Sequence, residues 1–81
     1  MLIVYSKNNC PYCVKAKKYL ELKGIPYQEI NIQNDIDAKS FILSEGHTTV
    51  PQIYLNNELF VDGGCNGLLN LSEEELFEKL K

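Results

Sequence analysis

Hydrophobic and polar positions along the first half of the chain switch between strand-like and helix-like spacing. Residues 2–5 (LIVY) form a continuous apolar run, which predicts a strand buried on both faces. Helical spacing follows from about Pro11 to Lys23, and Gly24 supplies a stop. Residues 27–32 predict a second strand, parallel to the first within a βαβ unit. The inner stripe of the helix consists of Cys13, Ala16 and Leu20.

A second helix is predicted after this unit. Asn34 or Asp35 can cap it, and it continues to about Glu45 before Gly46 ends it. Its expected core side consists of Ile36, Phe41 and Ile42.

The segment around Pro51 predicts a hairpin preceded by unpaired backbone. Residues 52–55 and 58–61 indicate two strands, and Asn56-Asn57 between them suits the positive φ angles of a two-residue turn. Because Pro51 forces the residue before it to be extended, Val50 should lie as a stub with no strand partner. Such a stub suits pairing with a peptide-like ligand, but it is equally explained by a proline that simply begins a strand.

Two short helices are expected at the end. The first is expected over residues 64–70 and begins at the Gly63-Gly64 pair. Paired glycines at a helix start can point backbone N–H groups at an anion, or they can merely turn the chain. Ser72 and Glu75 form a capping box for the second, which ends near Leu80. The elements follow one another as βαβαββα, which indicates the α/β class.

A length of 81 residues predicts a single domain, residues 1–81. Apolar residues make up 44%, an ordinary share, and no apolar stretch is long enough to span a membrane. The N-terminus lacks a signal-peptide pattern and three cysteines do not make a disulfide framework, so we expect a cytoplasmic monomer. A net charge of −3 without any arginine argues against nucleic acid as a partner.

Cys10 and Cys13 carry the chemistry suggested by the sequence. Positions i and i+3 share a helix face, within reach of a disulfide. Free N–H groups and the helix dipole favour negative charge at a helix N-terminus, so a reactive thiolate at Cys10 should be stabilised. Cys13, inside the first turn, is better placed to resolve a mixed disulfide.

The charge around this pair agrees with that interpretation. Residues 7–18 contain four lysines and no acid, although the chain is acidic overall. Lys7 lies off the helix beside the thiol and is either functional or merely solvated. The other three are interpreted as a solvated helix face: Lys15, Lys17 and Lys18.

Other interpretations of the pair are a structural disulfide or half of a zinc site completed by His47 and Cys65. Zinc sites usually bring their second pair of ligands at short spacing too, whereas His47 and Cys65 are far apart. A CxxC motif beside a βαβ pattern therefore favours thioredoxin-like redox chemistry. His47, the only histidine, is expected to be solvated in a loop.

The motifs NNCPYC, TTVPQIY and GGCNGL together resemble the glutaredoxin family over nearly the whole chain. The resemblance implies a thioredoxin-like fold, with a four-stranded mixed sheet of order 2-1-3-4 flanked by helices and a cis bond before Pro51. Cys10 would be the nucleophile and Cys13 the resolving thiol. Glutathione would be the reducing co-substrate, no metal is expected, and disulfide-containing proteins such as ribonucleotide reductase would be partners.

The same resemblance implies a glutathione site. Val50 would pair through its backbone with the cysteine of glutathione, and Lys7 would meet the glycyl carboxylate. Backbone N–H groups near Cys65 and Asn66 would hold the γ-glutamyl carboxylate, so the Cys65 thiol itself is not required. The implied set is Lys7, Tyr12, Thr49, Val50, Pro51, Gly64, Cys65 and Asn66.

Two departures from the family pattern concern glutathione binding. The family often carries Asp-Asp after Gly-Gly-Cys, the first meeting the γ-glutamyl ammonium, whereas this chain has Asn66-Gly67. The lost charge assistance would cost ~1 kcal/mol. Many members also have Gln or Arg eleven residues before the TVP threonine, where this chain has Ala38. The adjacent Lys39 would substitute only if the helix turned slightly.

These observations predict a glutathione-dependent thiol–disulfide oxidoreductase. Cys10 attacks a disulfide, Cys13 displaces the reduced protein, and two glutathiones restore the dithiol. An alternative, motivated by Asn66-Gly67 and Ala38, is a redoxin reduced directly by thioredoxin reductase. A third is an iron–sulfur or metal carrier that bridges two subunits through the first cysteine and glutathione.

Overall fold

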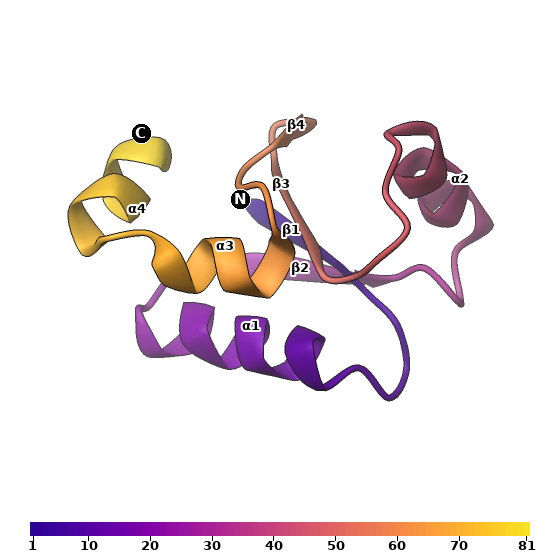
Figure 1. Ribbon diagram of the computed structural model, residues 1–81, viewed down its shortest axis with the longest axis horizontal. Coiled ribbons are helices and arrows are strands. Elements are labelled where there is room, and N and C mark those ends of the chain that lie inside the picture. Colours follow the sequence, from indigo (N-terminus) through magenta and orange to yellow (C-terminus); the bar gives the residue numbers. More distant parts are fainter.

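The computed structural model describes residues 1–81 as a four-stranded mixed sheet with helices on both faces (Figure 1). The sheet order is β2-β1-β3-β4, with β1 parallel to β2 and antiparallel to β3, and β4 antiparallel to β3. The elements are β1 (Leu2–Ser6), α1 (Pro11–Leu22), β2 (Tyr27–Asn31), α2 (Ile36–Ser44), β3 (Gln52–Leu55), β4 (Glu58–Leu59), α3 (Gly64–Asn70) and α4 (Glu73–Lys79). The thioredoxin-like arrangement implied by the sequence is confirmed.

Each face of the sheet buries its own cluster, because successive side chains of a strand point to opposite faces. Leu2 and Val4 of β1 join the larger cluster, which also holds apolar side chains of α1, α3 and α4. Tyr5 points to the other face and packs with Tyr54 of β3 and with α2. Figure 1 accordingly shows α1 and α3 together on one side of the strands and α2 apart from them.

Local sequence signals set the element ends where they were expected. Asp35 caps α2 by accepting the N–H of Ala38 at 3.0 Å. Ser72 and Glu75 form the predicted capping box of α4. Asn56 and Asn57 have φ angles of 52° and 68°, which confirms the two-residue hairpin.

Two expectations about packing were wrong. Ile36 was assigned to the core side of α2, but it is 80% exposed, because the helix turns Ala38 and Ile42 toward the sheet. The second hairpin strand was expected to reach Val61, but β4 ends at Leu59. Phe60 and Val61 both enter the larger cluster, and consecutive residues of a strand cannot face the same side.

None of the four helices combines the length and the apolar character needed to cross a membrane.

Candidate active site

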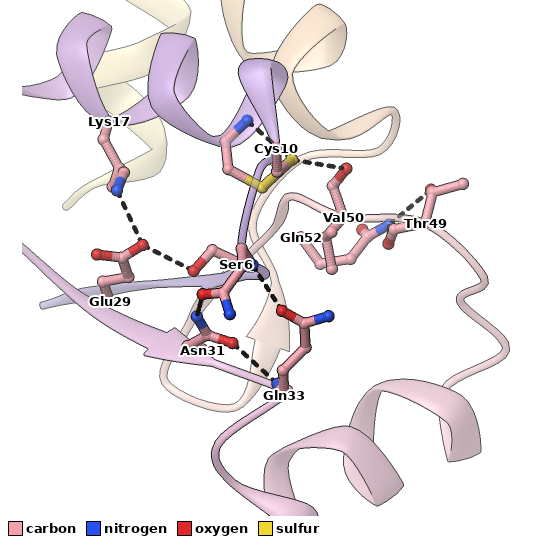
Figure 2. Close-up of a disulfide and its surroundings, with 11 residues drawn as sticks. Ser6, Cys10, Lys17, Glu29, Asn31, Gln33, Thr49, Val50 and Gln52 are labelled. Atoms are coloured by element: carbon pink, nitrogen blue, oxygen red, sulfur yellow. Dashed lines mark hydrogen bonds and ion pairs between the residues drawn. A yellow bond between two sulfur atoms is a disulfide. The ribbon is translucent and has the colours of Figure 1, made fainter.

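The two cysteines of the CxxC motif form a disulfide at the start of α1, with their Cα atoms 5.2 Å apart (Figure 2). Cys10 is the N-cap residue and Pro11 takes the first helical position, where no N–H is needed. The N–H of Cys13 points at the sulfur of Cys10 across 3.2 Å, and the first turn contains no acid. Cys10 is 7% exposed and Cys13 only 2%. Cys10 is thus the more exposed residue of the pair, and a thiolate there would receive a hydrogen bond.

Val50 places unpaired backbone beside this sulfur. Its carbonyl oxygen lies 3.8 Å from the Cys10 sulfur, which has no proton while the disulfide is closed (Figure 2). The bond between Val50 and Pro51 is cis, as the family resemblance implied. Strand β3 begins only at Gln52, and the N–H and C=O of Val50 form no backbone hydrogen bond. The predicted stub without a strand partner is confirmed.

A groove of about 430 Å³ runs from this stub to the start of α3. Gly64 lets α3 approach, because its φ is +58° and a Cβ there would lie 2.5 Å from the Pro51 carbonyl oxygen. The N–H groups of Cys65 and Asn66 have no acceptor in the protein, because the helical bonds of α3 begin one residue later. Seven of the residues implied for glutathione line this groove: Tyr12, Thr49, Val50, Pro51, Gly64, Cys65 and Asn66.

Lys7 lines a second hollow, of about 240 Å³, which adjoins the groove at Val50. Lys39 of α2 lines the same hollow. Lys39 reaches this hollow without the turn of α2 that was expected to be necessary from the sequence. Ala38 is buried against the sheet, and the next residue along a helix, about a quarter turn further round, then faces the hollow. The hollow therefore has two ammonium groups and no carboxylate in its lining.

A sequence model of the family described as glutaredoxin matches residues 2–60, which include the CxxC motif and the Val50–Pro51 bond. This chain belongs to the glutaredoxin family. Glutaredoxin 1 of Rickettsia prowazekii (strain Madrid E) is 43% identical over 82 residues, covering 98% of this chain and 84% of the relative. Glutaredoxin 3 of Escherichia coli (strain K12) is 41% identical over 69 residues, covering 84% of this chain and 81% of the relative.

Solved glutaredoxin structures share the fold. The holo form of glutaredoxin C1 from Populus tremula x tremuloides is similar with a TM-score of 0.79 at 25% identity, covering 98% of this chain and 74% of that one. A buckwheat glutaredoxin–glutathione complex is similar with a TM-score of 0.71 at 29% identity, covering 98% and 71%. Family membership together with the Cys10–Cys13 pair makes this glutaredoxin a thiol–disulfide oxidoreductase with a redox-active disulfide.

In this glutaredoxin the backbone itself requires one of the two departures from the family's Asp-Asp pattern, the glycine at position 67. A Cβ at position 67 would overlap the carbonyl oxygen of Asp62, so the second Asp of the family pattern does not fit there. Asp62 itself lines the groove and is the one carboxylate among the lining residues. Sequence reasoning missed it, although its position directly before Gly63-Gly64 was a usable signal.

Cys65 is a free thiol buried in the larger cluster, at the edge of the groove. Burial raises its pKa, and Lys15 lowers it by less. A protonated, enclosed thiol is a poor nucleophile. This environment agrees with the expectation that Cys65 does not act through its thiol.

His47 is not the solvated loop residue that the sequence suggested. Its Nε2 lies 2.8 Å from the hydroxyl of Tyr54, and the two rings meet edge to face. Since the Tyr54 hydroxyl donates to Glu45 at 3.1 Å, the histidine nitrogen is the donor to the phenol oxygen. Burial and the bond to Glu45 raise the pKa of Tyr54 to about 12. No local pattern marks a contact between positions 47 and 54, which only the fold creates.

A polar network beside the disulfide was also missed: Ser6, Lys17 and Glu29 (Figure 2). The buried hydroxyl of Ser6 donates to the Glu29 carboxylate at 2.7 Å, and Lys17 donates to the same oxygen at 2.9 Å. These hydrogen bonds, that of Lys17 first, hold the pKa of Glu29 below its usual value. Lys17 is therefore an ion-pair partner, and its assignment to a solvated helix face was wrong.

The zinc interpretation finds no geometric support. His47 and Cys65 do not join the Cys10–Cys13 pair in a four-ligand set, and no three His, Cys, Asp or Glu side chains are grouped to hold a metal ion.

Proposed function

We propose that this glutaredoxin is a glutathione-dependent oxidoreductase that reduces protein and mixed disulfides through Cys10 and Cys13. The observation that carries the proposal is the unpaired backbone of Val50 beside the Cys10 sulfur. A peptide-like thiol that pairs with Val50 brings its own sulfur to Cys10. Support for glutathione as this thiol comes from the buckwheat relative, which was solved as a glutathione complex.

The two ends of the tripeptide find suitable partners on either side of Val50. Lys7 and Lys39 suit the glycyl carboxylate, because they line the hollow that contains no acid. The free N–H groups of Cys65 and Asn66 suit the γ-glutamyl carboxylate. The remaining proposed contacts, which shape the groove, are Tyr12, Thr49, Pro51 and Gly64.

The γ-glutamyl ammonium group needs an anion, and Asp62 is the carboxylate that the groove offers. We assign this role to Asp62 because position 66 is a neutral Asn and position 67 admits no side chain. In this proposal the carboxylate that meets the ammonium group precedes the Gly63-Gly64 pair, whereas in the family pattern it follows the pair.

The reaction balances as two successive exchanges. The Cys10 thiolate attacks a substrate disulfide and releases one substrate thiolate, then Cys13 attacks the Cys10 sulfur and releases the other, closing the protein disulfide. One glutathione thiolate attacks Cys10 and releases Cys13, and a second attacks the bound glutathione sulfur and frees Cys10. Two glutathiones are oxidised to glutathione disulfide for each substrate disulfide that is reduced.

Direct reduction by thioredoxin reductase is the second candidate, and the missing acid at Asn66-Gly67 favours it. Both candidates operate in a reducing compartment, which a free buried Cys65 and an odd number of cysteines suit, so we assign the protein to the cytoplasm. Disulfide-containing proteins, ribonucleotide reductase among them, are the proposed clients.

The test compares two electron donors on one disulfide substrate: glutathione with its reductase, and thioredoxin reductase with NADPH. We expect turnover with glutathione and its loss in Cys10→Ser, whereas Lys18→Gln, at an exposed lysine of α1, serves as the control. Preferential turnover with thioredoxin reductase would overturn the choice of donor. Full activity of Cys10→Ser would overturn the assignment of the nucleophile.

A further inference from the structure

The sulfur of Cys13 carries the charge that is released when the disulfide opens, because it is the leaving thiolate. The Cys10 sulfur accepts the N–H of Cys13, but no hydrogen bond reaches the sulfur of Cys13. With Cys13 only 2% exposed, water is a limited source of stabilisation for that charge. The speed of opening then depends on what charged group lies near Cys13.

Lys17 is the one cation that shares both a helix face and a hollow with Cys13. It follows Cys13 by four residues on α1, so both side chains leave the same helix face. Both also line a hollow of about 600 Å³ on the β2 side of the disulfide. The charged residues of this lining are Lys7, Lys17 and Glu29.

Glu29 of β2 holds Lys17 in place. Its carboxylate accepts from Lys17 at 2.9 Å and from the buried Ser6 hydroxyl at 2.7 Å, so the Ser6 bond anchors the carboxylate that pairs with Lys17 (Figure 2). The carboxylate also offsets part of the ammonium charge, because it lines the same hollow.

We propose that Lys17 stabilises the Cys13 thiolate during disulfide opening and closing, and that Glu29 limits how much of the Lys17 charge is available. When a thiolate attacks the Cys10 sulfur, a new S–S bond forms there and the bond to Cys13 breaks with its electron pair on Cys13. Lys17 meets this charge without giving up a proton, since an ammonium is a weaker acid than a thiol. In the closing direction the same interaction raises the fraction of Cys13 present as the attacking thiolate.

This inference deepens the proposed function, because it assumes that incoming thiolates attack Cys10 and release Cys13. It predicts effects of opposite sign from the two members of one ion pair. Lys17→Gln removes the stabilising charge, and opening of the disulfide by dithiothreitol at neutral pH should slow about threefold. Glu29→Gln removes the offsetting charge and should speed the same step by a similar factor. The double variant should return to the original rate.

A purely structural ion pair would give a different result, because both single variants lose the same contact and would change the rate in one direction. Lys18→Gln is the matched control, since it removes an exposed lysine of the same helix from outside the hollow. Lys17→Arg, which keeps the charge, should restore the rate. An unchanged rate in Lys17→Gln, or changes of the same sign in both single variants, would overturn the proposal.

A second measurement excludes attraction of the incoming anion as the cause. In a Cys10→Ser, Cys65→Ala background, Cys13 is the one cysteine left, so its rate of alkylation by iodoacetamide across a pH series reports the Cys13 thiolate alone. Lys17→Gln should raise the pH of half-ionisation and Glu29→Gln should lower it, and no movement in either variant would contradict the proposal. Neither measurement uses glutathione, so a negative result would contradict the role of Lys17 without affecting the proposal that glutathione is the co-substrate. Conversely, the comparison of electron donors could exclude glutathione while both measurements support the role of Lys17.

Discussion

The amide nitrogen of Cys13 lies 3.2 Å from the sulfur of Cys10, so the helix that carries Cys13 also offers a hydrogen-bond donor to the proposed nucleophile. Reduced Cys10 should therefore be alkylated by iodoacetamide well below pH ~8.5, where an ordinary thiol ionises. Cys65 should react only at higher pH, because burial raises its pKa. Mass spectrometry of protein alkylated across a pH series measures both sites in one sample.

Cys13→Ser keeps the backbone N–H and is the matched control for this experiment. It should leave the early alkylation of Cys10 in place, since the donor is the amide and not the thiol. Alkylation of Cys10 at the pH of a free cysteine in both proteins would show that the helix start does not activate the thiol.

The close approach of Gly64 to the Pro51 carbonyl predicts a large cost for a small substitution. In Gly64→Ala the Cβ would lie 2.5 Å from that oxygen, at a φ of +58°. Strain and overlap together should lower the free energy of unfolding by ~3 kcal/mol, measured by urea unfolding. Gly24→Ala has a similar φ of +69° but nothing within 4 Å, so it should cost only ~1 kcal/mol. Equal losses of unfolding free energy in the two variants would mean that the backbone around Pro51 moves to accommodate the new Cβ at position 64.

Sequence reasoning succeeded where one local signal decides an outcome. Cys10 at an N-cap, Asn56-Asn57 in a hairpin and the Ser72 capping box are each determined by neighbours a few residues away. It failed where the chain must first fold. The His47–Tyr54 contact joins a loop to a strand, and Lys17 meets Glu29 only when α1 lies beside β2.

The glutathione-site residues predicted from the sequence illustrate the same limit. Seven of the eight residues that the resemblance implied line one groove, but Asp62 of the same groove was missed, and Lys39 was considered only with a turn of the helix. Neither charge lies in the part of a motif that the resemblance used, and only the folded chain brings Asp62 to the groove and Lys39 to the hollow beside Lys7. The direction of Lys39 follows from the burial of Ala38, which the helical pattern alone did not settle.

The raised pKa of Tyr54 predicts that the free energy of unfolding falls at alkaline pH. Its pKa is raised from 10.0 to about 12 by burial and by the hydrogen bond to Glu45. The unfolded chain therefore loses this proton near pH 10 while the folded protein keeps it, so the stabilisation is complete below pH 10 and is lost as pH rises toward 12. Urea unfolding across this range should show a falling free energy of unfolding, to which Tyr27, with its pKa also raised to about 12, contributes.

Tyr54→Phe should flatten that decline, because a phenyl ring has no proton to lose. Tyr12→Phe, at an exposed tyrosine, is the control and should keep the slope of the original protein. An unchanged slope in Tyr54→Phe would show that the Tyr54 hydroxyl is not the group responsible.

The proposed contact between Asp62 and the γ-glutamyl ammonium predicts that a substitution of Asp62 weakens binding only of ligands that carry this ammonium group. Asp62→Asn should raise the KM for glutathione about fivefold, because a charge-assisted contact to the γ-glutamyl ammonium becomes neutral. A glutathione analogue without the amino group should show no such difference between the two proteins. Glu58→Gln, an exposed acid of β4 outside the groove, is the control. An equal effect on both ligands would place Asp62 in a structural role.

Lys7 and Lys39 line one hollow, and each should contribute to holding the glycyl carboxylate. Lys7→Gln and Lys39→Gln should each raise the KM for glutathione about two- to fivefold, the range of a solvent-exposed ion pair, with kcat little changed. Glutathione with an amidated glycyl end should bind the original protein more weakly and should be insensitive to both substitutions. This analogue separates recognition of the carboxylate from any general effect of lost positive charge on thiolate chemistry. If Lys39→Gln left the KM for glutathione unchanged while Lys7→Gln raised it, Lys7 alone would meet the carboxylate and Lys39 would only shape the hollow.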